Sequence, residues 1–291
     1  MSIMSGIHDI VLVSGVEKMT HLSTADATLL IAAGLDFHVD QWHGLTFPGF
    51  YALMATRHMH LYGTTEEDMA RVAVKNHANG ALNPKAHFQK PITVEQALSS
   101  RVVAWPLKLY DCCPISDGAA VLVLARPDLA RKFTDSPVHV IGQGLAVESI
   151  FSFEKDYEKC SFIANVEAAR SAYKMAGIEP KNVDFAEVHD CFTINEIISY
   201  EDLGFCKKGE GAKMIREGIV ERGGKIPVNV SGGLKSKGHP TGATGAAQLY
   251  EVYLQLTGQA EKRQLNKAEI ALTHNIGGTG ASATVTICRR G

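Results

Sequence analysis

The sequence predicts an α/β fold. Strand-like runs rich in Val, Ile and Leu alternate with amphipathic helical segments, and this alternation is typical of a sheet covered by helices. Apolar residues make up 45% and charged residues 21% of the 291 residues. These proportions are those of a globular protein and exclude a disordered chain. A chain of this length has room for one large domain or two medium ones.

The first half is expected to begin with a strand at 10–13, whose unbroken run of Ile, Val and Leu predicts burial on both faces. Such a strand needs neighbours, yet the next clear strand is a second buried one at 119–125, followed by a third at 138–145. The intervening residues 16–105 have weak periodicity and are interpreted as a helical insertion. Within it, a capping box at 64–67 predicts the start of a helix.

The second half alternates more regularly. A helix at 161–175 is followed by Gly177 and Pro180, which together form a stop signal. The other expected elements are helices at 192–203 and 241–256 and strands at 183–188, 269–273 and 282–288. The last two strands are expected to form a hairpin-like pair. We expect functional residues where the strands end.

Charge and cysteine content exclude several classes of protein. Lys and Arg total 29 against 31 Asp and Glu, a net charge of −2 with no basic cluster, so neither nucleic acid nor an anionic membrane is an expected partner. No apolar run reaches the roughly eighteen residues of a membrane span, and the first residues do not resemble a signal peptide. Six cysteines without C-x-x-C spacing predict neither a disulfide scaffold nor a metal site. The sequence therefore predicts a soluble, cytoplasmic protein.

Three segments of the second half concentrate reactive side chains and glycines. The first, Glu187 to Phe192, crosses a strand-to-helix junction. A cysteine near a helix N-terminus is stabilised as the thiolate, so Cys191 is a candidate reactive thiol, and His189 is placed to share its proton. A buried cysteine beside a capping Asp190 explains the pattern about equally well.

The second segment, 229–245, has glycines before a helix, an arrangement that permits tight turns and close backbone approach. It lacks the spacing of a phosphate-binding P-loop. His239 stands between Gly238 and Pro240, and the proline restricts its backbone to extended conformations. Taken alone, the motif favours a surface-loop histidine. In a glycine-rich helix entry, a catalytic base or oxyanion donor becomes the better interpretation.

The third segment is HNIGGTG, from His274 to Gly280. It precedes a strand instead of opening a helix, which excludes a dinucleotide-binding fingerprint. A glycine turn with free N–H groups, as at Gly277, suits an oxyanion hole. An ordinary tight turn is the alternative, and for this motif alone it is favoured.

Together the segments HDCF, NVSGGLKSKGHPTGATG and HNIGGTG resemble the thiolase superfamily, in particular the sterol-carrier-protein-type and archaeal acetoacetyl-CoA thiolases. The likeness extends over the chain through DIVLVSGVEKMT and PLKLYDCCPISDGAA. It implies a layered αβαβα fold of two similar halves. Residues 1–145 would be the remainder of the N-terminal half, with its inserted helical domain at about 16–105, and residues 146–291 would be the C-terminal half.

The resemblance also implies roles for individual residues. His239 matches the histidine that activates the nucleophile, His189 the residue that helps to bind the thioester oxygen, and Cys191 the acid/base cysteine. Gly277 would donate a backbone N–H to an oxyanion hole. Expected contacts with substrate and coenzyme A come from Ser231, Gly232, Lys235, Lys237 and His274. The two lysines would meet phosphates, although solvated loop lysines are the alternative that the residues favour.

The chain departs from this pattern at the nucleophile. In the family, the nucleophilic cysteine precedes the segment that matches the opening strand, and Cys112 and Cys113 fall in a different, structural stretch. The expectation is an incomplete first half, with the nucleophile supplied by a segment encoded upstream or by a separate polypeptide.

Three functions follow as hypotheses. The first is a thiolase-type acyltransferase that uses an acyl-CoA thioester as substrate, with no further cofactor and no metal, in Claisen condensation or thiolytic cleavage. The others are a non-catalytic CoA-binding scaffold subunit and a nucleophile-free retro-aldolase acting on a β-hydroxyacyl-CoA. The expected partners are further copies of the chain, an accessory protein with an OB-fold and a zinc ribbon, or the separate N-terminal segment.

Overall fold

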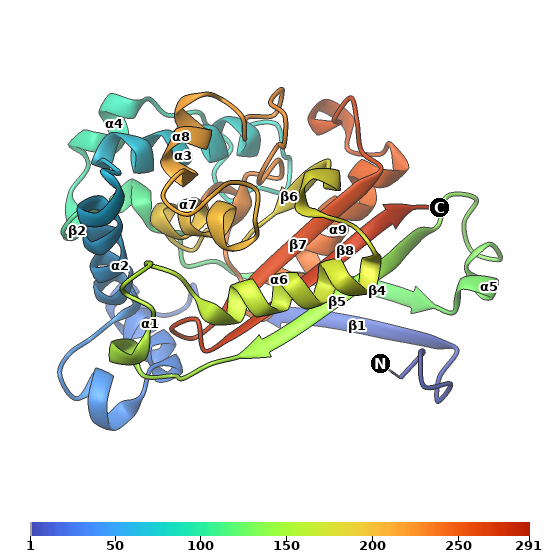
Figure 1. Ribbon diagram of the computed structural model, residues 1–291, viewed down its shortest axis with the longest axis horizontal. Helices are drawn as coiled ribbons and strands as arrows, with labels where there is room; N and C mark the ends of the chain where they lie inside the picture. Colours follow the sequence, from blue (N-terminus) through green and yellow to red (C-terminus); the bar gives the residue numbers. More distant parts are fainter. Residues whose placement is uncertain (1) are drawn as a thin grey trace.

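The computed structural model describes residues 2–291, and its second half is built on a four-stranded sheet (Figure 1). The strand order is β5–β8–β7–β6, with bounds Val138–Val147, Ser282–Arg290, Ile270–Gly277 and Phe185–Glu187. The pairs β5–β8 and β7–β8 are antiparallel, whereas β6 runs parallel to β7. The predicted hairpin of the last two strands is confirmed. β5 crosses the predicted boundary between the halves, and that division stays a prediction.

Helices lie on both faces of this sheet. α6 (Ile163–Ala176) packs on β5 and β8, while α9 (Thr244–Thr257) contacts β7 on the opposite face and also both strands of the smaller sheet formed by β1 and β4. The order helix, sheet, helix, sheet is the layered α/β arrangement that was expected. Both helices end within one residue of their predicted ends, at Gly177 (φ 66°) and Gly258 (φ 76°), which adopt the left-handed conformation that favours glycine.

β1 (Ile10–Glu17) and β4 (Gly118–Ala125) pair antiparallel with each other and with no other strand of residues 2–291. The prediction that both are buried is wrong. Leu12 is 67% exposed and Val13, on the opposite face, is 38% exposed, and Val123 of β4 is 67% exposed. An apolar run indicates that a strand can be buried on both faces. Here α9 covers part of one face, and the described residues do not supply an element that covers the other.

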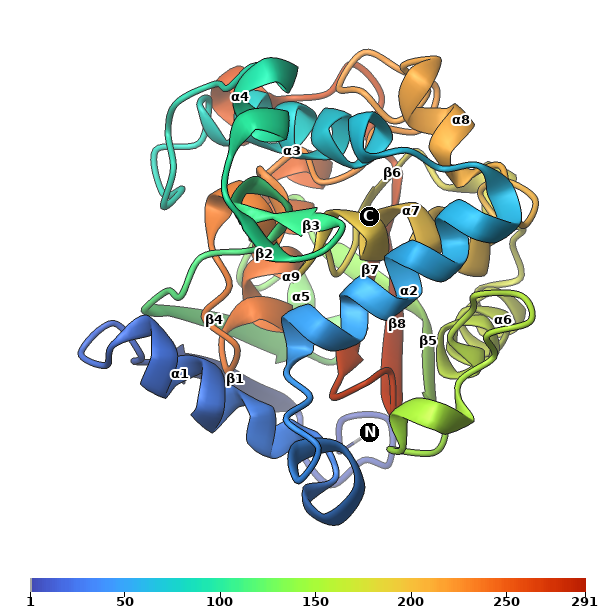
Figure 2. The ribbon, with the colours of Figure 1, turned by 90° about the vertical axis from the view of Figure 1, so that its left-hand side faces the viewer.

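The segment between β1 and β4 is mostly helical, as expected, and it faces the viewer in Figure 2. Its elements are α1 (Thr24–Ile31), α2 (Phe47–Tyr62), α3 (Glu66–Gly80), α4 (Val94–Ser99), β2 (Val102–Ala104) and β3 (Leu107–Lys108). A capping box opens α3 one residue later than the predicted 64–67, because Thr65 and Asp68 bond each other's backbone N–H groups. The remaining helices are α5 (Pro127–Ala130), α7 (Thr193–Asp202) and α8 (Gly211–Arg216).

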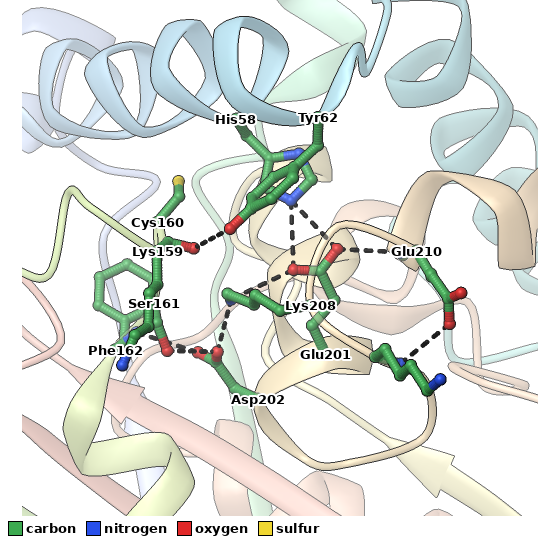
Figure 3. A network of polar contacts seen from close by, with 12 residues as sticks. His58, Tyr62, Lys159, Cys160, Ser161, Phe162, Glu201, Asp202, Lys208 and Glu210 are labelled. Atoms are coloured by element: carbon green, nitrogen blue, oxygen red, sulfur yellow. Dashed lines mark hydrogen bonds and ion pairs between the residues drawn. The ribbon is translucent and has the colours of Figure 1, made fainter.

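A buried polar network holds α2 against α7 (Figure 3). The Nε2 of His58 on α2 lies 3.1 Å from a carboxylate oxygen of Glu201 on α7. Lys208 Nζ bridges Glu201 (3.2 Å) and Asp202 (2.8 Å), and Asp202 accepts a bond from Ser161 Oγ at 2.6 Å. Because each carboxylate is paired, these buried charges fix the insertion on the C-terminal half without leaving an uncompensated group.

Candidate functional site

A cavity of about 1380 Å³ lies between the helical insertion and the C-terminal half. All four residues that the sequence singled out as catalytic line it: His189, Cys191, His239 and Gly277. They come from the loop after β6, the glycine-rich loop before α9 and the end of β7. The strand ends therefore bring together residues that are far apart in the sequence.

The two histidines face each other at the cavity wall. The ring centroids of His189 and His239 are 4.9 Å apart with an interplanar angle of 88°. Burial lowers the pKa of His189 to about 4, and burial together with the nearby His189 holds the pKa of His239 well below its usual value. Both rings are therefore neutral at pH 7, the form in which an imidazole can accept a proton.

The tautomer of His239 follows from its neighbours. Its Nδ1 lies 2.7 Å from Thr244 Oγ1, and the same hydroxyl is 2.9 Å from the backbone oxygen of Pro240. A carbonyl oxygen only accepts, so the single hydroxyl proton goes to Pro240 and Thr244 accepts from His239 Nδ1–H. The neutral ring then has its lone pair on Nε2. His239 is thus prepared to act as a base through Nε2.

Asn275 orients His189, and the sequence analysis missed this residue. Its Oδ1 lies 3.4 Å from His189 Nδ1, while its Nδ2 donates to Gln248 Oε1 at 2.5 Å. Gln248 in turn donates to the backbone oxygen of His274 at 3.3 Å. Because side chains alternate along β7, Asn275 lines the cavity whereas the predicted His274 does not.

Cys191 is buried, at 7% exposure, just before α7. Burial raises its pKa well above the ordinary value, with Cys113 adding to the effect and a hydrogen bond to Tyr51 opposing it. The expectation that the helix N-terminus stabilises a thiolate here is wrong, because loss of solvation outweighs that electrostatic gain. No hydrogen bond between His189 and Cys191 is found among residues 2–291, so the proton sharing between them stays a prediction. Cys191 enters the site as a neutral thiol that can donate a proton.

Two further cysteines, Cys112 and Cys113, also line the cavity. Burial raises the pKa of each to about 12, with Lys235 partly offsetting it. Neither thiol is therefore ionised at neutral pH. This result agrees with the sequence interpretation that they do not replace the nucleophile.

Asp190 joins the first two sequence segments. Its carboxylate accepts bonds from the backbone N–H groups of Leu234 (2.7 Å) and Lys235 (3.1 Å) in the glycine-rich loop. Gly233 has a φ of 58°, and a Cβ there would come within 2.3 Å of the Asp190 carboxylate. The loop can approach this carboxylate only because position 233 has no side chain.

The residues expected to contact coenzyme A have different positions. Ser231 and Gly232 are buried outside the cavity lining, with Ser231 bonded to Glu187 and Gly232 packed on Gly80. Lys235 lines the cavity at 2% exposure. Lys237 does not line it, and its Nζ is buried without a hydrogen-bond partner among residues 2–291. The alternative of solvated loop lysines is therefore wrong for both.

Within the described range 2–291, no helix is both long and apolar enough to traverse a bilayer. Over the same range, no three His, Cys, Asp or Glu side chains are grouped so as to hold a metal ion.

Family models match both halves of the chain. A thiolase N-terminal domain matches residues 1–128, and a thiolase C-terminal domain-like model matches residues 151–290. The chain is also similar to a solved structure described as the Ltp2-ChsH2(DUF35) aldolase, with a TM-score of 0.86 and 29% identity over 99% of this chain and 74% of that one.

Curated relatives agree with these models. An acetyl-CoA acetyltransferase of Methanothermobacter thermautotrophicus is 51% identical over all of this chain, which covers 75% of the relative. Sterol carrier protein 2 of Bos taurus is 38% identical over 99% of this chain and 55% of its own length. With matching domains on both sides of a cavity that holds the expected histidines, the chain belongs to the thiolase family of enzymes.

Proposed function

We propose that the protein is an acyltransferase of the thiolase type that acts on acyl-CoA thioesters, in condensation or in thiolytic cleavage, with no cofactor besides the thioester. The observation that carries the proposal is the pair of neutral histidines, 4.9 Å apart, in one cavity with the Cys191 thiol. The 51% identity to a protein named acetyl-CoA acetyltransferase supports the same class of reaction.

The proposed roles follow from protonation states. His239 Nε2 takes the proton of an attacking thiol, and the resulting Nε2–H then donates to the oxyanion that forms. The backbone N–H of Gly277 is assigned to the thioester oxygen, where a positioned donor stabilises developing negative charge. His189 is assigned to the same oxygen and donates to it through Nε2 only as the imidazolium, because in the neutral ring the single proton lies on Nδ1, toward Asn275 Oδ1. In thiolytic cleavage the neutral Cys191 thiol gives its proton to the carbon next to the thioester carbonyl and becomes a thiolate. In condensation the thiolate form takes that proton.

We further propose that the attacking thiolate comes from a segment outside residues 2–291, either of the same polypeptide or of a partner. The three cysteines of the cavity all have raised pKa values, so none is a ready nucleophile. The cavity of about 1380 Å³ exceeds the roughly 300–1,000 Å³ of ordinary ligand pockets, which leaves room for polypeptide beside a substrate.

Mass spectrometry of the protein as isolated, with whatever polypeptide accompanies it, tests this proposal. After incubation with acetyl-CoA, an acetyl group is expected on a cysteine outside residues 2–291, and His239→Asn should abolish the labelling. Thr244→Ser keeps the hydroxyl that orients His239 and should label normally, whereas Thr244→Val should label at least tenfold more slowly. Acetylation of Cys112, Cys113 or Cys191 would refute the proposed source of the nucleophile.

A retro-aldolase is the second candidate, favoured by the structural likeness to a protein described as an aldolase. In that reaction a base removes the β-hydroxyl proton of a β-hydroxyacyl-CoA, and no acyl-enzyme forms. Cleavage of such a substrate without any labelled cysteine would select this candidate. A non-catalytic scaffold subunit is the third hypothesis. It predicts that His239→Ala leaves the activity of the partner protein almost intact.

We also propose a homo-oligomer or a complex, located in the cytoplasm. The apolar side chains exposed on β1 and β4 support association, because exposed strand edges and apolar faces favour it. We propose an accessory protein with an OB-fold and a zinc ribbon as one partner, and the likeness to a structure described as the Ltp2-ChsH2(DUF35) aldolase supports a partner. Light scattering on the purified protein should show a mass above 31.4 kDa, and a monodisperse monomer would contradict association.

A further inference from the structure

Asp190 has a fully buried carboxylate on the segment between β6 and α7. Three N–H groups donate to it. Two are the backbone N–H groups of Leu234 and Lys235 in the glycine-rich loop (229–245), at 2.7 and 3.1 Å, and the third is Asn76 Nδ2 of α3, at 2.7 Å. The carboxylate therefore connects the loop and the helical insertion to the segment that follows β6.

These bonds join the two parts of the proposed site. His189 and Cys191 are the sequence neighbours of Asp190, and His239 lies in the glycine-rich loop, four residues after Lys235. The bonded N–H groups belong to the start of the helical turn Gly233–Lys237, where backbone N–H groups have no partner within the turn. Asp190 does not itself line the cavity, so it can act on the reaction only through the residues that it holds.

This arrangement requires an ionised Asp190. A carboxylate only accepts hydrogen bonds, and the three groups of residues 2–291 that bond to it are all donors. A protonated carboxyl would carry an O–H that needs an acceptor. The carboxylate of Glu196 is close by, since its Oε2 accepts from the same Asn76 Nδ2 at 2.6 Å, but a bond to it would displace Asn76. Protonation of Asp190 therefore breaks at least one of the three bonds.

The surroundings of Asp190 favour protonation near neutral pH. Ionisable groups that interact with it come from every element packed against it: Lys75 of α3, Cys113, Cys191, Glu196 and Tyr200 of α7, and Lys235 of the loop. Burial and the charge of Glu196 raise the pKa of Asp190 to about 7, while the N–H of Leu234 and the charge of Lys75 oppose this rise. The carboxylate is thus ionised at pH 8 and largely protonated at pH 6.

We infer that Asp190 is a positioning residue, whose ionised carboxylate holds the glycine-rich loop, and with it His239, in register with His189 and Cys191. This inference rests on the proposed function, because positioning affects a rate only if these three side chains serve one reaction. The hydrogen bonds themselves can be measured without any reaction, which keeps the two proposals separable.

Nuclear magnetic resonance of the wild-type protein tests the bonds without turnover. The ¹H–¹⁵N amide signals of Leu234 and Lys235 should move together between pH 5 and pH 9, with a midpoint near 7. Ser231 is an internal reference, because its N–H donates to Glu187 instead, at 3.0 Å; burial and the charge of Glu251 raise the pKa of that acid to about 7 as well. In Asp190→Asn the first two signals should stop titrating, whereas the Ser231 signal should still move.

Kinetics test the consequence for the reaction. In Asp190→Asn the side chain is neutral at every pH, so kcat for acyl transfer from acetyl-CoA at pH 8 should fall about tenfold or more, with little change in KM. The ratio of wild-type to variant kcat should shrink toward one as the pH falls to 6. A merely structural role would lower kcat by the same factor at both pH values.

Asp184→Asn is the matched control. Asp184 precedes β6, and its carboxylate also accepts two backbone N–H groups, from Glu269 and Ile270, both at 3.0 Å. It bonds the start of β7 and not the glycine-rich loop, so its kcat and pH profile should stay within about twofold of wild type.

The outcomes separate the positioning role from the proposed function. Leu234 and Lys235 signals that do not move between pH 5 and pH 9 in the wild type overturn the inference, even if Asp190→Asn fails to fold. A folded Asp190→Asn variant with the wild-type kcat and pH profile overturns it too. Titrating amides in a protein that transfers no acyl group would support the hold of Asp190 on the loop and refute the proposed function alone.

Discussion

The ion pair between Lys75 and Glu196 yields a quantitative prediction. Lys75 lies on α3 and Glu196 on α7, their side chains are 0% exposed, and Nζ and Oε1 are 2.8 Å apart. The Glu196 carboxylate also accepts bonds from Asn76 (2.6 Å) and Asn229 (2.8 Å), which belong to the insertion and the glycine-rich loop. The pair therefore helps to hold together the segments that surround the cavity.

Glu196→Gln keeps the size of the side chain and removes its charge. Lys75 is then left as an unpaired buried ammonium, a change that costs about 3–5 kcal/mol of unfolding free energy. Lys75→Met leaves the Glu196 carboxylate unpaired and should cost a similar amount. In the double variant neither charge is left, so the loss should be about the same as for one single variant. The expected coupling energy is therefore about 3–5 kcal/mol, the size of one single loss.

Urea denaturation at pH 7, followed by circular dichroism, measures each step of this cycle. Glu67→Gln is the control, since its i,i+4 partner Arg71 lies 2.6 Å away on the surface of α3 and such exposed pairs contribute about 0.3–0.5 kcal/mol. Additive losses in the double variant would refute the reasoning, as would a single-variant loss below about 1 kcal/mol.

Three further predictions concern pH, thiol reactivity and packing. Burial lowers the pKa of His274 to about 3, so its contribution to stability is full above the unfolded pKa near 6.5 and is lost as the pH falls toward 3. Between pH 7 and pH 5 the wild type should lose about 2 kcal/mol more unfolding free energy than His274→Gln, measured in parallel urea titrations. Equal losses in the two proteins would contradict this prediction. Because burial raises its pKa, Cys191 should react with iodoacetamide at pH 8 at least tenfold more slowly in the folded than in the urea-unfolded protein. Rapid labelling of the folded protein, seen by mass spectrometry, would contradict the conclusion that Cys191 is a buried, neutral thiol. A Cβ added at Gly144 would lie 1.8 Å from the backbone oxygen of Ala168, so Gly144→Ala should lower the melting temperature by at least 5 °C. The control Gly223→Ala, where a Cβ meets open space, should change it little. A wild-type melting temperature for Gly144→Ala would show that α6 can move away from β5.

Helix boundaries were the most predictable part of the fold, because their signals are local. Gly177 and Gly258 end their helices, and the cap at Thr65 opens another, through bonds and dihedral angles within a few residues. The exposure of Leu12 was not predictable in this way. It depends on whether other chain elements cover β1, which its own sequence does not record.

The candidate site was predictable as a set of segments and less so as individual side chains. A strand sends alternate residues to opposite faces, so the motif at the end of β7 left open whether His274 or Asn275 faces the cavity. The packing of α6 decides it, since Asn165 on that helix lies 2.9 Å from His274 Nε2. The burial of Lys235 likewise depends on Tyr110 and Cys112, more than a hundred residues earlier.

The exposed sheet of β1 and β4 has a calorimetric consequence. Apolar groups that are already hydrated in the folded state add nothing to the heat capacity when the chain unfolds. With Val16 73% and Val123 67% exposed, residues 2–291 should unfold with a heat-capacity increment below the usual 12–15 cal/mol/K per residue. Any molecule that covers the sheet would raise this increment, so scanning calorimetry reports the covering of β1 and β4 without knowledge of what covers them.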